Sequence, residues 1–297
     1  MQFHFRVAAK CNLSLRVEGR YEDGYHRLDM CSASVGVWDR IALRFPDSKG
    51  RDAGDAPVIV CRMDGRPQDA RNSAYLAAER YCQKYGLPGA EIEIFKGIPF
   101  CAGMGGSSAD AAGVLRALNE CFGCAAPGEL ETLALSCGAD VPYMLYGGFA
   151  RVQGKGELIE RFEPKKHCAL VLLKSGSVLT AQAYQAYDRQ PPALAISTNE
   201  VVRAAAEGRW SALARCAGND LRPGAERLCE GVARNLKLLR EFGALYADMT
   251  GSGSAVFGIF ESLARAEAVA RACKGRAENI IACMTLSHGF EILERKY

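Results

Sequence analysis

The chain has 297 residues, and its 37 Lys and Arg against 34 Asp and Glu leave a formal net charge of +3. This near balance argues against a nucleic-acid partner, which would call for a strongly basic face. The N-terminus has no long apolar run after a basic start, and no window approaches about eighteen uninterrupted apolar residues. We therefore expect a cytoplasmic protein without a membrane segment, long enough to fold without disulfides or a structural metal.

The first half of the chain contains both strand and helix patterns. Alternating polar and apolar residues indicate strands, and apolar residues three and four apart indicate helices. In chain order we expect strands over 3–17 and 31–45, a polar loop over 47–56, a strand over 58–61, a helix over 72–85, a strand over 90–95, and helices over 111–118 and 129–136.

A glycine-rich stretch over 147–157 and a polar break at 164–166 divide the chain. Beyond them the pattern predicts strands over 169–173, 244–249, 255–260 and 280–285, and helices over 198–207, 225–242 and 263–273. We place a domain boundary near residues 155–165, which gives domains 1–160 and 161–297. Strands and helices in both halves predict a two-domain α+β enzyme with its site in the cleft between the domains.

The segment 99–110, called here the first glycine loop, is the strongest chemical signal in the chain. Gly103, Gly105 and Gly106 allow the backbone to approach a ligand and to take a positive φ. Ser107 and Ser108 bring hydroxyls to the start of the following helix, where free N–H groups and the helix dipole attract anions. The pattern predicts a cradle for the phosphates of ATP, although it matches neither G-x-x-x-x-G-K-[ST] nor G-x-G-x-x-G. A glycine-rich turn with a serine helix cap explains the loop alone equally well.

Three further segments carry groups suited to phosphoryl chemistry. The second glycine loop, residues 249–254, lies between two predicted strands and is either a hairpin turn or a second phosphate-facing loop. Asp140 follows a predicted helix, and Lys10 lies among small and apolar residues. If these two side chains met, the carboxylate could accept a hydroxyl proton while the ammonium lowered the pKa of that hydroxyl and neutralised phosphate charge.

Thirteen cysteines are scattered singly, apart from the close pair Cys121 and Cys124. Without a signal peptide, an odd number predicts reduced thiols that act mostly as small buried hydrophobes. The close pair has no second pair and no nearby His to complete a four-ligand zinc site, so we interpret it as structural.

Together these segments resemble the GHMP kinase superfamily, which includes galactokinase, homoserine kinase and mevalonate kinase. Three motifs come in that family's order, namely the segment around Lys10, the first glycine loop and the second glycine loop. Within the superfamily the chain looks most like the kinases that act on the cytidine diphosphate derivative of methylerythritol in non-mevalonate isoprenoid synthesis. The likeness runs over nearly the whole length. The stretches that carry it are Ala9-Lys10-Cys11-Asn12-Leu13, Gly19-Arg20, Asp23-Gly24-Tyr25-His26-Arg27-Leu28, Gly138-Ala139-Asp140-Val141-Pro142-Tyr143, Gly154-Lys155-Gly156-Glu157 and Asn219-Asp220-Leu221.

The resemblance implies a ribosomal protein S5 domain 2-like N-terminal domain and a ferredoxin-like C-terminal domain. It implies transfer of the γ-phosphate of ATP, with Mg²⁺ bridging the phosphates, to the 2-hydroxyl of the cytidine diphosphate-linked methylerythritol. We expect a monomer or a homodimer with neither a nucleic-acid nor a membrane partner.

The resemblance also implies roles for individual residues. Lys10 and Asp140 match the family's catalytic pair. The positions that match the residues around ATP are Pro99, Phe100, Cys101, Ala102, Gly103, Met104, Gly105, Gly106, Ser107, Ser108 and Ala109. The positions that match substrate contacts are Asn12 near the reacting hydroxyl, His26 at the cytosine edge, and Tyr25 and Tyr184 on its two faces.

Two alternatives stay open on the sequence alone. The serines of the first glycine loop are shifted, and this motivates a GHMP kinase for another small alcohol. Ala109, which stands in place of a hydroxyl, motivates a nucleotide-binding relative that has lost catalysis, but the presence of both Lys10 and Asp140 speaks against that reading.

Overall fold

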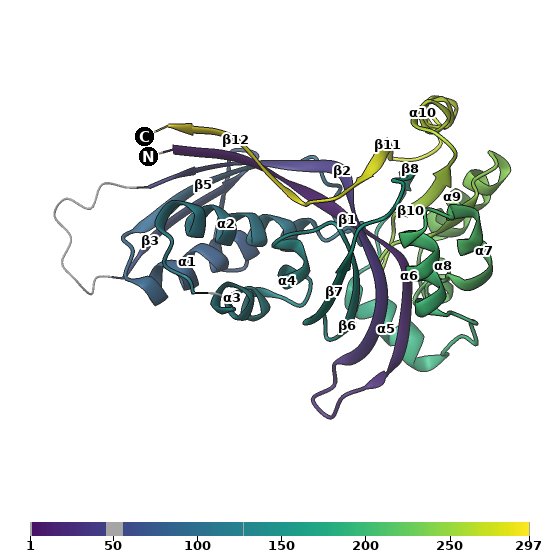
Figure 1. The fold of residues 1–297 in the computed structure, drawn as a ribbon, viewed down its shortest axis with the longest axis horizontal. Helices are drawn as coiled ribbons and strands as arrows, with labels where there is room; N and C mark the ends of the chain where they lie inside the picture. Colours follow the sequence, from purple (N-terminus) through teal and green to yellow (C-terminus); the bar gives the residue numbers. More distant parts are fainter. Residues whose placement is uncertain (1, 46–55, 127, 297) are drawn as a thin grey trace.

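Two long strands that pair as one hairpin run through both halves of the molecule (Figure 1). The computed structural model describes residues 2–45, 56–126 and 128–296. Strands β1 (Gln2–Arg20) and β2 (His26–Arg44) pair antiparallel, with register shifts near Ala8, Asn12 and Val17. Such irregularities bend a strand and increase its twist. The two predicted strands are therefore confirmed, and both are longer than the alternation indicated.

The N-terminal half places helices against a sheet that grows from this hairpin. Its strand order is β4-β3-β5-β2, and β6 and β7 continue from the other part of β2. Figure 1 shows α1, α2 and α3 gathered below the sheet. The strands are β3 (Val58–Met63), β4 (Arg66–Gln68), β5 (Gly89–Phe95), β6 (Phe149–Gly154) and β7 (Leu158–Phe162), and the helices are α1 (Ser73–Tyr85), α2 (Gly106–Phe122), α3 (Glu129–Cys137) and α4 (Val141–Met144).

The C-terminal half has an antiparallel sheet of order β11-β8-β10-β9. Pairing of Thr285 and Leu286 with β2 joins this sheet to the hairpin. The strands are β8 (Ala169–Lys174), β9 (Tyr246–Met249), β10 (Val256–Phe260) and β11 (Asn279–Leu286). The helices are α5 (Thr180–Arg189), α6 (Thr198–Ala206), η1 (Trp210–Ala212), α7 (Leu213–Cys216), α8 (Arg222–Leu228), α9 (Glu230–Glu241) and α10 (Leu263–Ala272). The predicted α+β architecture is confirmed.

The last strand returns to the first half of the molecule. Strand β12 (Phe290–Lys296) pairs antiparallel with β1, so that Lys296 lies opposite Gln2. The two chain ends accordingly lie side by side in Figure 1.

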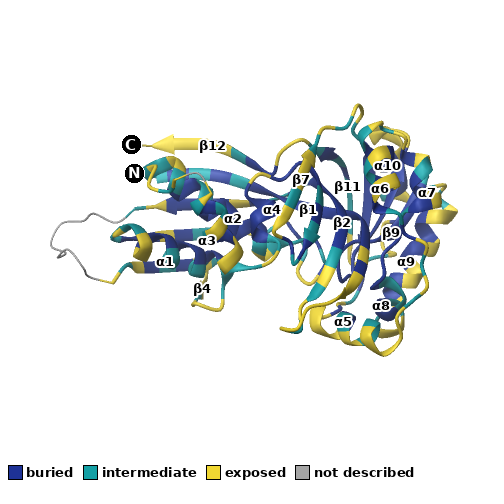
Figure 2. Ribbon diagram, turned by 60° about the horizontal axis from the view of Figure 1, so that its bottom comes forward, coloured by how far each residue is buried: buried dark blue, intermediate teal, exposed yellow. Residues whose placement is uncertain are grey.

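Close packing of α2 on β1 positions the first glycine loop, because that loop leads directly into α2. Phe3, Phe5 and Val7 alternate along β1 and are buried, each such side chain contributing about 1.5–3 kcal/mol on burial. A Cβ atom at Gly113 would lie 2.8 Å from the Phe5 ring, so glycine is what allows α2 to come this near. Figure 2 shows the resulting continuous buried interior between the sheet and the helices.

Several elements differ from the sequence expectation. The helix expected over 225–242 is two helices, α8 and α9, because Cys229 has an extended backbone between them with φ −147° and ψ 102°. Helix α5 and strands β6, β7 and β12 were not predicted. The polar loop expected over 47–56 lies, up to residue 55, outside the described residues. Within the described ranges no helix is both long enough and apolar enough to cross a membrane.

Candidate active site

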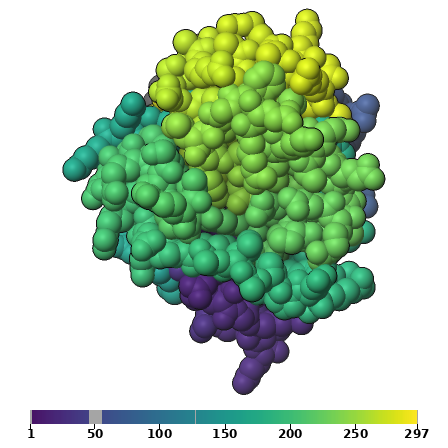
Figure 3. Space-filling model, turned by 90° about the vertical axis from the view of Figure 1, so that its right-hand side faces the viewer, coloured from purple at the N-terminus to yellow at the C-terminus, as the bar shows by residue number. Residues whose placement is uncertain are grey.

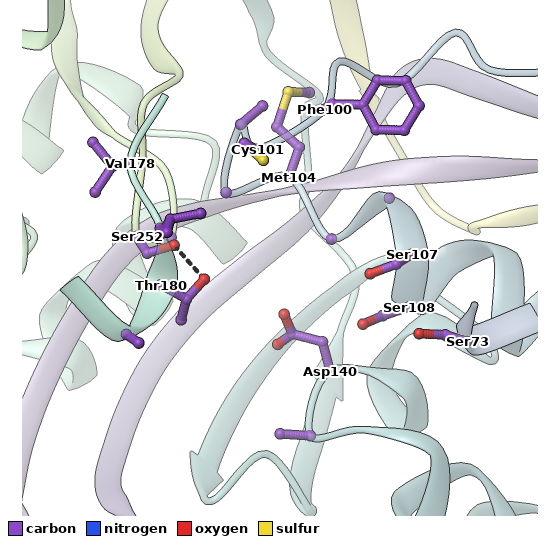
Figure 4. Close-up of a pocket in the computed structure, with 18 of the residues that line it drawn as sticks. Ser73, Phe100, Cys101, Met104, Ser107, Ser108, Asp140, Val178, Thr180 and Ser252 are labelled. Atoms are coloured by element: carbon purple, nitrogen blue, oxygen red, sulfur yellow. Dashed lines mark hydrogen bonds between the residues drawn. The ribbon is translucent and has the colours of Figure 1, made fainter. Parts of the chain in front are cut away.

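A cavity of about 1490 Å³ lies where the two halves of the molecule meet. Its walls come from the β1–β2 hairpin, the first glycine loop, the start of α4, helix α5 and the second glycine loop. Figure 4 shows the side chains of Ser107, Ser108 and Asp140 on one side and Thr180 and Ser252 on the other. Residues from both sides of the predicted domain boundary therefore share one cavity.

The two glycine loops pack directly on each other. Gly103 has φ +71°, and a Cβ atom there would fall on the carbonyl oxygen of Thr250 and lie 2.8 Å from the Gly253 nitrogen. The N–H groups of Ser254 and Ala255 donate to carbonyl oxygens of the first glycine loop at 3.2 Å. The second glycine loop is thus both the connection between β9 and β10 and a wall of the cavity.

Lys10 and Asp140 come together at the floor of this cavity. The Lys10 ammonium lies 3.5 Å from the Asp140 carboxylate and donates to Asn12 Oδ1 at 2.6 Å. Its backbone N–H donates to the Met104 carbonyl, which ties β1 to the first glycine loop. The Lys10 side chain is only 6% exposed and that of Asp140 is 37% exposed, so the carboxylate is the member of the pair that a ligand reaches.

Asp140 lies at the start of α4 without serving as its cap. It is the residue before the first helical position, yet its side chain makes no capping hydrogen bond. Val141 begins α4 although it precedes Pro142, and the residue before a proline ordinarily disfavours the helical conformation. A proline in the first helical turn has no N–H that the helix needs, so this placement costs little.

Asn12 is held below Lys10. Its backbone N–H donates to Thr250 Oγ1 at 3.0 Å, and its side-chain amide nitrogen donates to Ser32 Oγ at 2.9 Å. With the amide nitrogen held there, the amide oxygen faces Lys10. Asn12 is 2% exposed and does not line the cavity, so its expected contact with the reacting hydroxyl stays a prediction.

Ten of the eleven positions predicted to surround ATP line the cavity. The exception is Ala109, which is 1% exposed and lies on the inner side of α2. The hydroxyls of Ser107 and Ser108 point into the space toward Asp140 (Figure 4). They stand in the first turn of a seventeen-residue helix, where free N–H groups favour anions.

A buried lysine with two carboxylates supports the first glycine loop from below. Lys96 Nζ contacts Asp39 and lies 2.8 Å from Asp110 Oδ2. Asp39 Oδ1 accepts the N–H groups of Gly97 and Ile98 at 2.7 and 2.8 Å, and thereby holds the approach to the loop. Burial raises the pKa of the Asp110 carboxyl. Burial alone would lower the pKa of Lys96, but the two carboxylates raise it.

At the other end of the cavity lie the aromatic residues predicted for the substrate. Tyr25 is 60% exposed and lies near the turn of the β1–β2 hairpin, which protrudes at the bottom of Figure 3. The Lys155 ammonium lies 5.0 Å from the centroid of the Tyr25 ring. The Tyr184 ring stacks on His26 with centroids 4.5 Å apart. Burial, and then the charge of Asp140, raise the pKa of the Tyr184 hydroxyl.

Sequence reasoning missed several residues of the cavity. Gln68, Asp69, Arg71, Asn72 and Ser73 line it around the start of α1, and Figure 4 shows Ser73 on the side opposite Thr180. The N-cap bond from the Ala74 N–H to the Asn72 side chain fits an Asn that precedes a helix, but nothing in that local pattern indicates a ligand.

Asn219 was recognised only as part of a motif, and the structure places it behind the second glycine loop. Its amide nitrogen donates to the carbonyl oxygens of Met249 and Gly251 at 2.8 and 2.9 Å. Its amide oxygen accepts the Leu221 N–H at 2.9 Å. Among residues 2–45, 56–126 and 128–296, no three His, Cys, Asp or Glu side chains form a metal-binding group.

Comparison with known proteins adds to this geometry. Residues 72–148 match the family described as GHMP kinases N terminal domain, and residues 201–289 match GHMP kinases C terminal. The chain is 39% identical to the 4-diphosphocytidyl-2-C-methyl-D-erythritol kinase of Pelotomaculum thermopropionicum, over 94% of this chain and 96% of that protein. It is 36% identical to the kinase of the same name from Desulfitobacterium hafniense, over 95% of each.

Solved structures of GHMP kinases are also similar to this chain. A crystal structure of 4-(cytidine 5'-diphospho)-2C-methyl-D-erythritol kinase is 30% identical to the chain with a TM-score of 0.78, covering 96% of this chain and 99% of that one. A homoserine kinase from Cytophaga hutchinsonii, 21% identical, has a TM-score of 0.72 over 98% and 97% of the two chains and shows a shared fold.

Proposed function

The chain belongs to the 4-diphosphocytidyl-2-C-methyl-D-erythritol kinase family of GHMP kinases, and from this we propose that it phosphorylates the 2-hydroxyl of that compound with ATP. The observation that carries the proposal is the Lys10–Asp140 pair, 3.5 Å apart at the base of a cavity walled by both glycine loops. A carboxylate and an ammonium beside a phosphate-binding loop are the groups that transfer to a hydroxyl requires.

In the proposed reaction the substrate 2-hydroxyl attacks the γ-phosphorus of ATP. A bond forms between that hydroxyl oxygen and phosphorus, and the bond from phosphorus to the β,γ-bridging oxygen breaks, which leaves ADP. Asp140 accepts the hydroxyl proton, and Lys10 holds Asp140 in place and stabilises the charge on the transferring group. Asn12 holds Lys10 at 2.6 Å, so the ammonium is already oriented before substrates bind.

The cavity suits Mg²⁺ that is bound together with the phosphates of ATP, as in kinases. Mg²⁺ is usually held by one or two carboxylates together with substrate phosphates and waters, and seldom by an all-protein cage. Ser107, Ser108 and Asp140 supply oxygen atoms that face the same space, and we propose them as the protein's contribution. Bound there, the ion would neutralise charge on the phosphates.

The aromatic end of the cavity suits the cytidine group. Tyr25 presents an exposed ring, and His26 presents an imidazole that is 11% exposed. Aromatic faces stack on bases irrespective of base identity, whereas an imidazole can read a base edge by hydrogen bonds. We propose that Tyr25 and Tyr184 bound the base and that His26 contacts its edge, in the cytoplasm where ATP and reduced thiols coexist.

The two alternatives are disfavoured by particular observations. A kinase for another small alcohol would have no use for an exposed tyrosine and a positioned imidazole at the substrate end. A catalytically silent relative would have no need to keep Asp140 within reach of Lys10 and open to the cavity.

The test is a coupled assay of ADP release with ATP, Mg²⁺ and 4-diphosphocytidyl-2-C-methyl-D-erythritol. Asp140→Asn should lower kcat by about 10²- to 10⁴-fold with little change in KM, because Asn keeps the size but cannot take the proton. Glu261→Gln removes one exposed carboxylate outside the cavity and serves as the matched control. Turnover of mevalonate or homoserine, with none of the cytidine compound, would instead support the other-alcohol alternative.

A further inference from the structure

Helix α5 holds the imidazole of His26 with three side chains from one face. Tyr184, Tyr187 and Asp188 follow the i, i+3, i+4 spacing that brings residues together on a helix. The Tyr184 ring stacks on His26 at 4.5 Å with an interplanar angle of 23°, and the Tyr187 ring meets it edge-on at 6.1 Å. Asp188 Oδ1 lies 2.7 Å from His26 Nε2. The ring is therefore fixed in position and in rotation.

The contact with Asp188 also decides which nitrogen of His26 carries hydrogen. A carboxylate only accepts hydrogen bonds, so the Nε2 atom beside it must carry the proton. In a neutral imidazole the other nitrogen is then a lone-pair acceptor. His26 lines the cavity, so Nδ1 is the ring nitrogen left for a ligand.

A second charge fixes Asp188 itself. Arg20 Nη1 lies 3.6 Å from Asp188 Oδ2, and Arg20 Nε donates to the Gly24 carbonyl at 2.8 Å. Arg20 therefore ties the carboxylate to the turn of the β1–β2 hairpin. Arg20 of β1 holds the Asp188 carboxylate on one side, and on the other side the carboxylate contacts His26 of β2. The position of the carboxylate is therefore fixed by two contacts.

Cytosine and uracil differ in the group on C4, which a hydrogen-bond acceptor such as His26 Nδ1 can distinguish. Cytosine carries an amino group on C4, which donates hydrogen bonds, whereas uracil carries a carbonyl oxygen there, as thymine does. An acceptor nitrogen attracts the amino group and repels the carbonyl. A donor nitrogen would have the opposite preference.

We propose that Asp188 is the positioning residue that makes the site select cytidine over uridine, by holding His26 in the form whose Nδ1 accepts a hydrogen bond from the cytosine amino group. This inference rests on the proposed function, because it needs a pyrimidine nucleotide substrate whose base lies beside His26. It goes beyond that function because it names Asp188, which contacts His26, as the residue that sets the preference of the site for cytidine over uridine.

The test compares two substrates, the cytidine diphosphate and the uridine diphosphate derivatives of methylerythritol, in the wild type and in Asp188→Asn. An Asn side chain can turn either its oxygen or its nitrogen to Nε2, so both neutral forms of His26 become available. The ratio of kcat/KM for cytidine to that for uridine should fall about tenfold to a hundredfold. Gln182→Lys is the matched control, since it changes the charge of exposed α5 surface by the same +1 and does not line the cavity.

A spectroscopic measurement reads the histidine directly. The chain has four His, so ¹⁵N chemical shifts of the imidazoles can be assigned with a His26→Gln variant. The neutral form of wild-type His26 should carry its hydrogen on Nε2, and Asp188→Asn should show a mixture of the two neutral forms or the reversed form.

The outcomes separate the inference from the proposed function. A wild type that phosphorylates the cytidine substrate, with a selectivity ratio unaltered in Asp188→Asn, overturns the inference and leaves the function standing. A wild-type His26 with hydrogen on Nδ1 overturns it as well, even if Asp188→Asn does not fold. A wild type inactive on both pyrimidine substrates refutes the proposed function, and with it the selectivity.

Discussion

Replacing Gly103 by alanine should separate the two glycine loops and thereby damage the candidate site. The new Cβ atom would fall on the Thr250 carbonyl oxygen and lie 2.8 Å from the Gly253 nitrogen, below the 3.0 Å that real Cβ atoms keep. Both neighbours are backbone atoms, which cannot swing aside as the end of a side chain can. The loops must therefore move apart, and the Met104 carbonyl that binds the Lys10 N–H moves with them.

The expected cost has two parts. An L-residue at a positive φ costs about 1–2 kcal/mol, and forcing a methyl group into a packed site costs about 1–3 kcal/mol. Gly103→Ala should thus lower the free energy of unfolding by roughly 2–5 kcal/mol. Displacement of the loop by about 1 Å should lower kcat by up to about 100-fold.

Gly123→Ala measures the cost of an L-residue at a positive φ alone. Gly123 has φ +64°, caps the other end of α2, and has nothing within 4 Å of the position its Cβ would take. Urea unfolding of both variants gives the difference, and the coupled ADP assay gives kcat and the KM for ATP. If Gly103→Ala were no less stable than Gly123→Ala and turned over normally, the close packing of the two loops would be refuted.

Three further changes test the surroundings of the cavity. Asn219→Ala leaves two loop carbonyls without their donor and should cost about 1–3 kcal/mol in urea unfolding; an unchanged midpoint would contradict the pinning of the second glycine loop. Lys96→Met leaves the buried carboxylates of Asp39 and Asp110 without their cation and should cost about 3–5 kcal/mol by the same measurement, with partial recovery on adding Asp110→Asn. Burial raises the pKa of the Asp220 carboxyl, so its contribution to stability is largest below the unfolded-state pKa and declines as pH rises through the folded-state pKa. The stability of Asp220→Asn relative to wild type should therefore increase between pH 4 and pH 7, and a constant difference in urea midpoints would count against this.

The sequence predicted elements well where one face of a regular pattern is buried. The strand over 90–95 alternates cleanly because β5 buries Ile92 and Ile94 and exposes Glu91. Helix α5 escaped prediction because Ala183 is its only buried residue, so no buried apolar face marks it in the sequence. Its residues Tyr184 and Asp188 line the cavity instead. Strand β12 escaped because only Phe290 in it is buried, and the adjacent apolar residues Ile292 and Leu293 are both exposed, so its sequence does not alternate.

The same limit applies to the site. The first glycine loop is a local signal, so its residues could be read from the chain, and the family resemblance paired Lys10 with Asp140. Asp188 could not be found in that way, because its meaning depends on His26, which lies 162 positions away. Lys96 acquires its role only where Asp39 and Asp110 are brought beside it by folding.

The pairing of β12 with β1 has a consequence for synthesis of the protein on the ribosome. Strand β2 is made soon after β1 and can pair early with one of its edges. The other edge stays bare over residues 2–7 until residues 290–296 have been made. Such an uncovered strand is a template for pairing with another chain. The nascent protein therefore carries this uncovered strand edge throughout the synthesis of residues 8–289, and pairing with β12 then removes it.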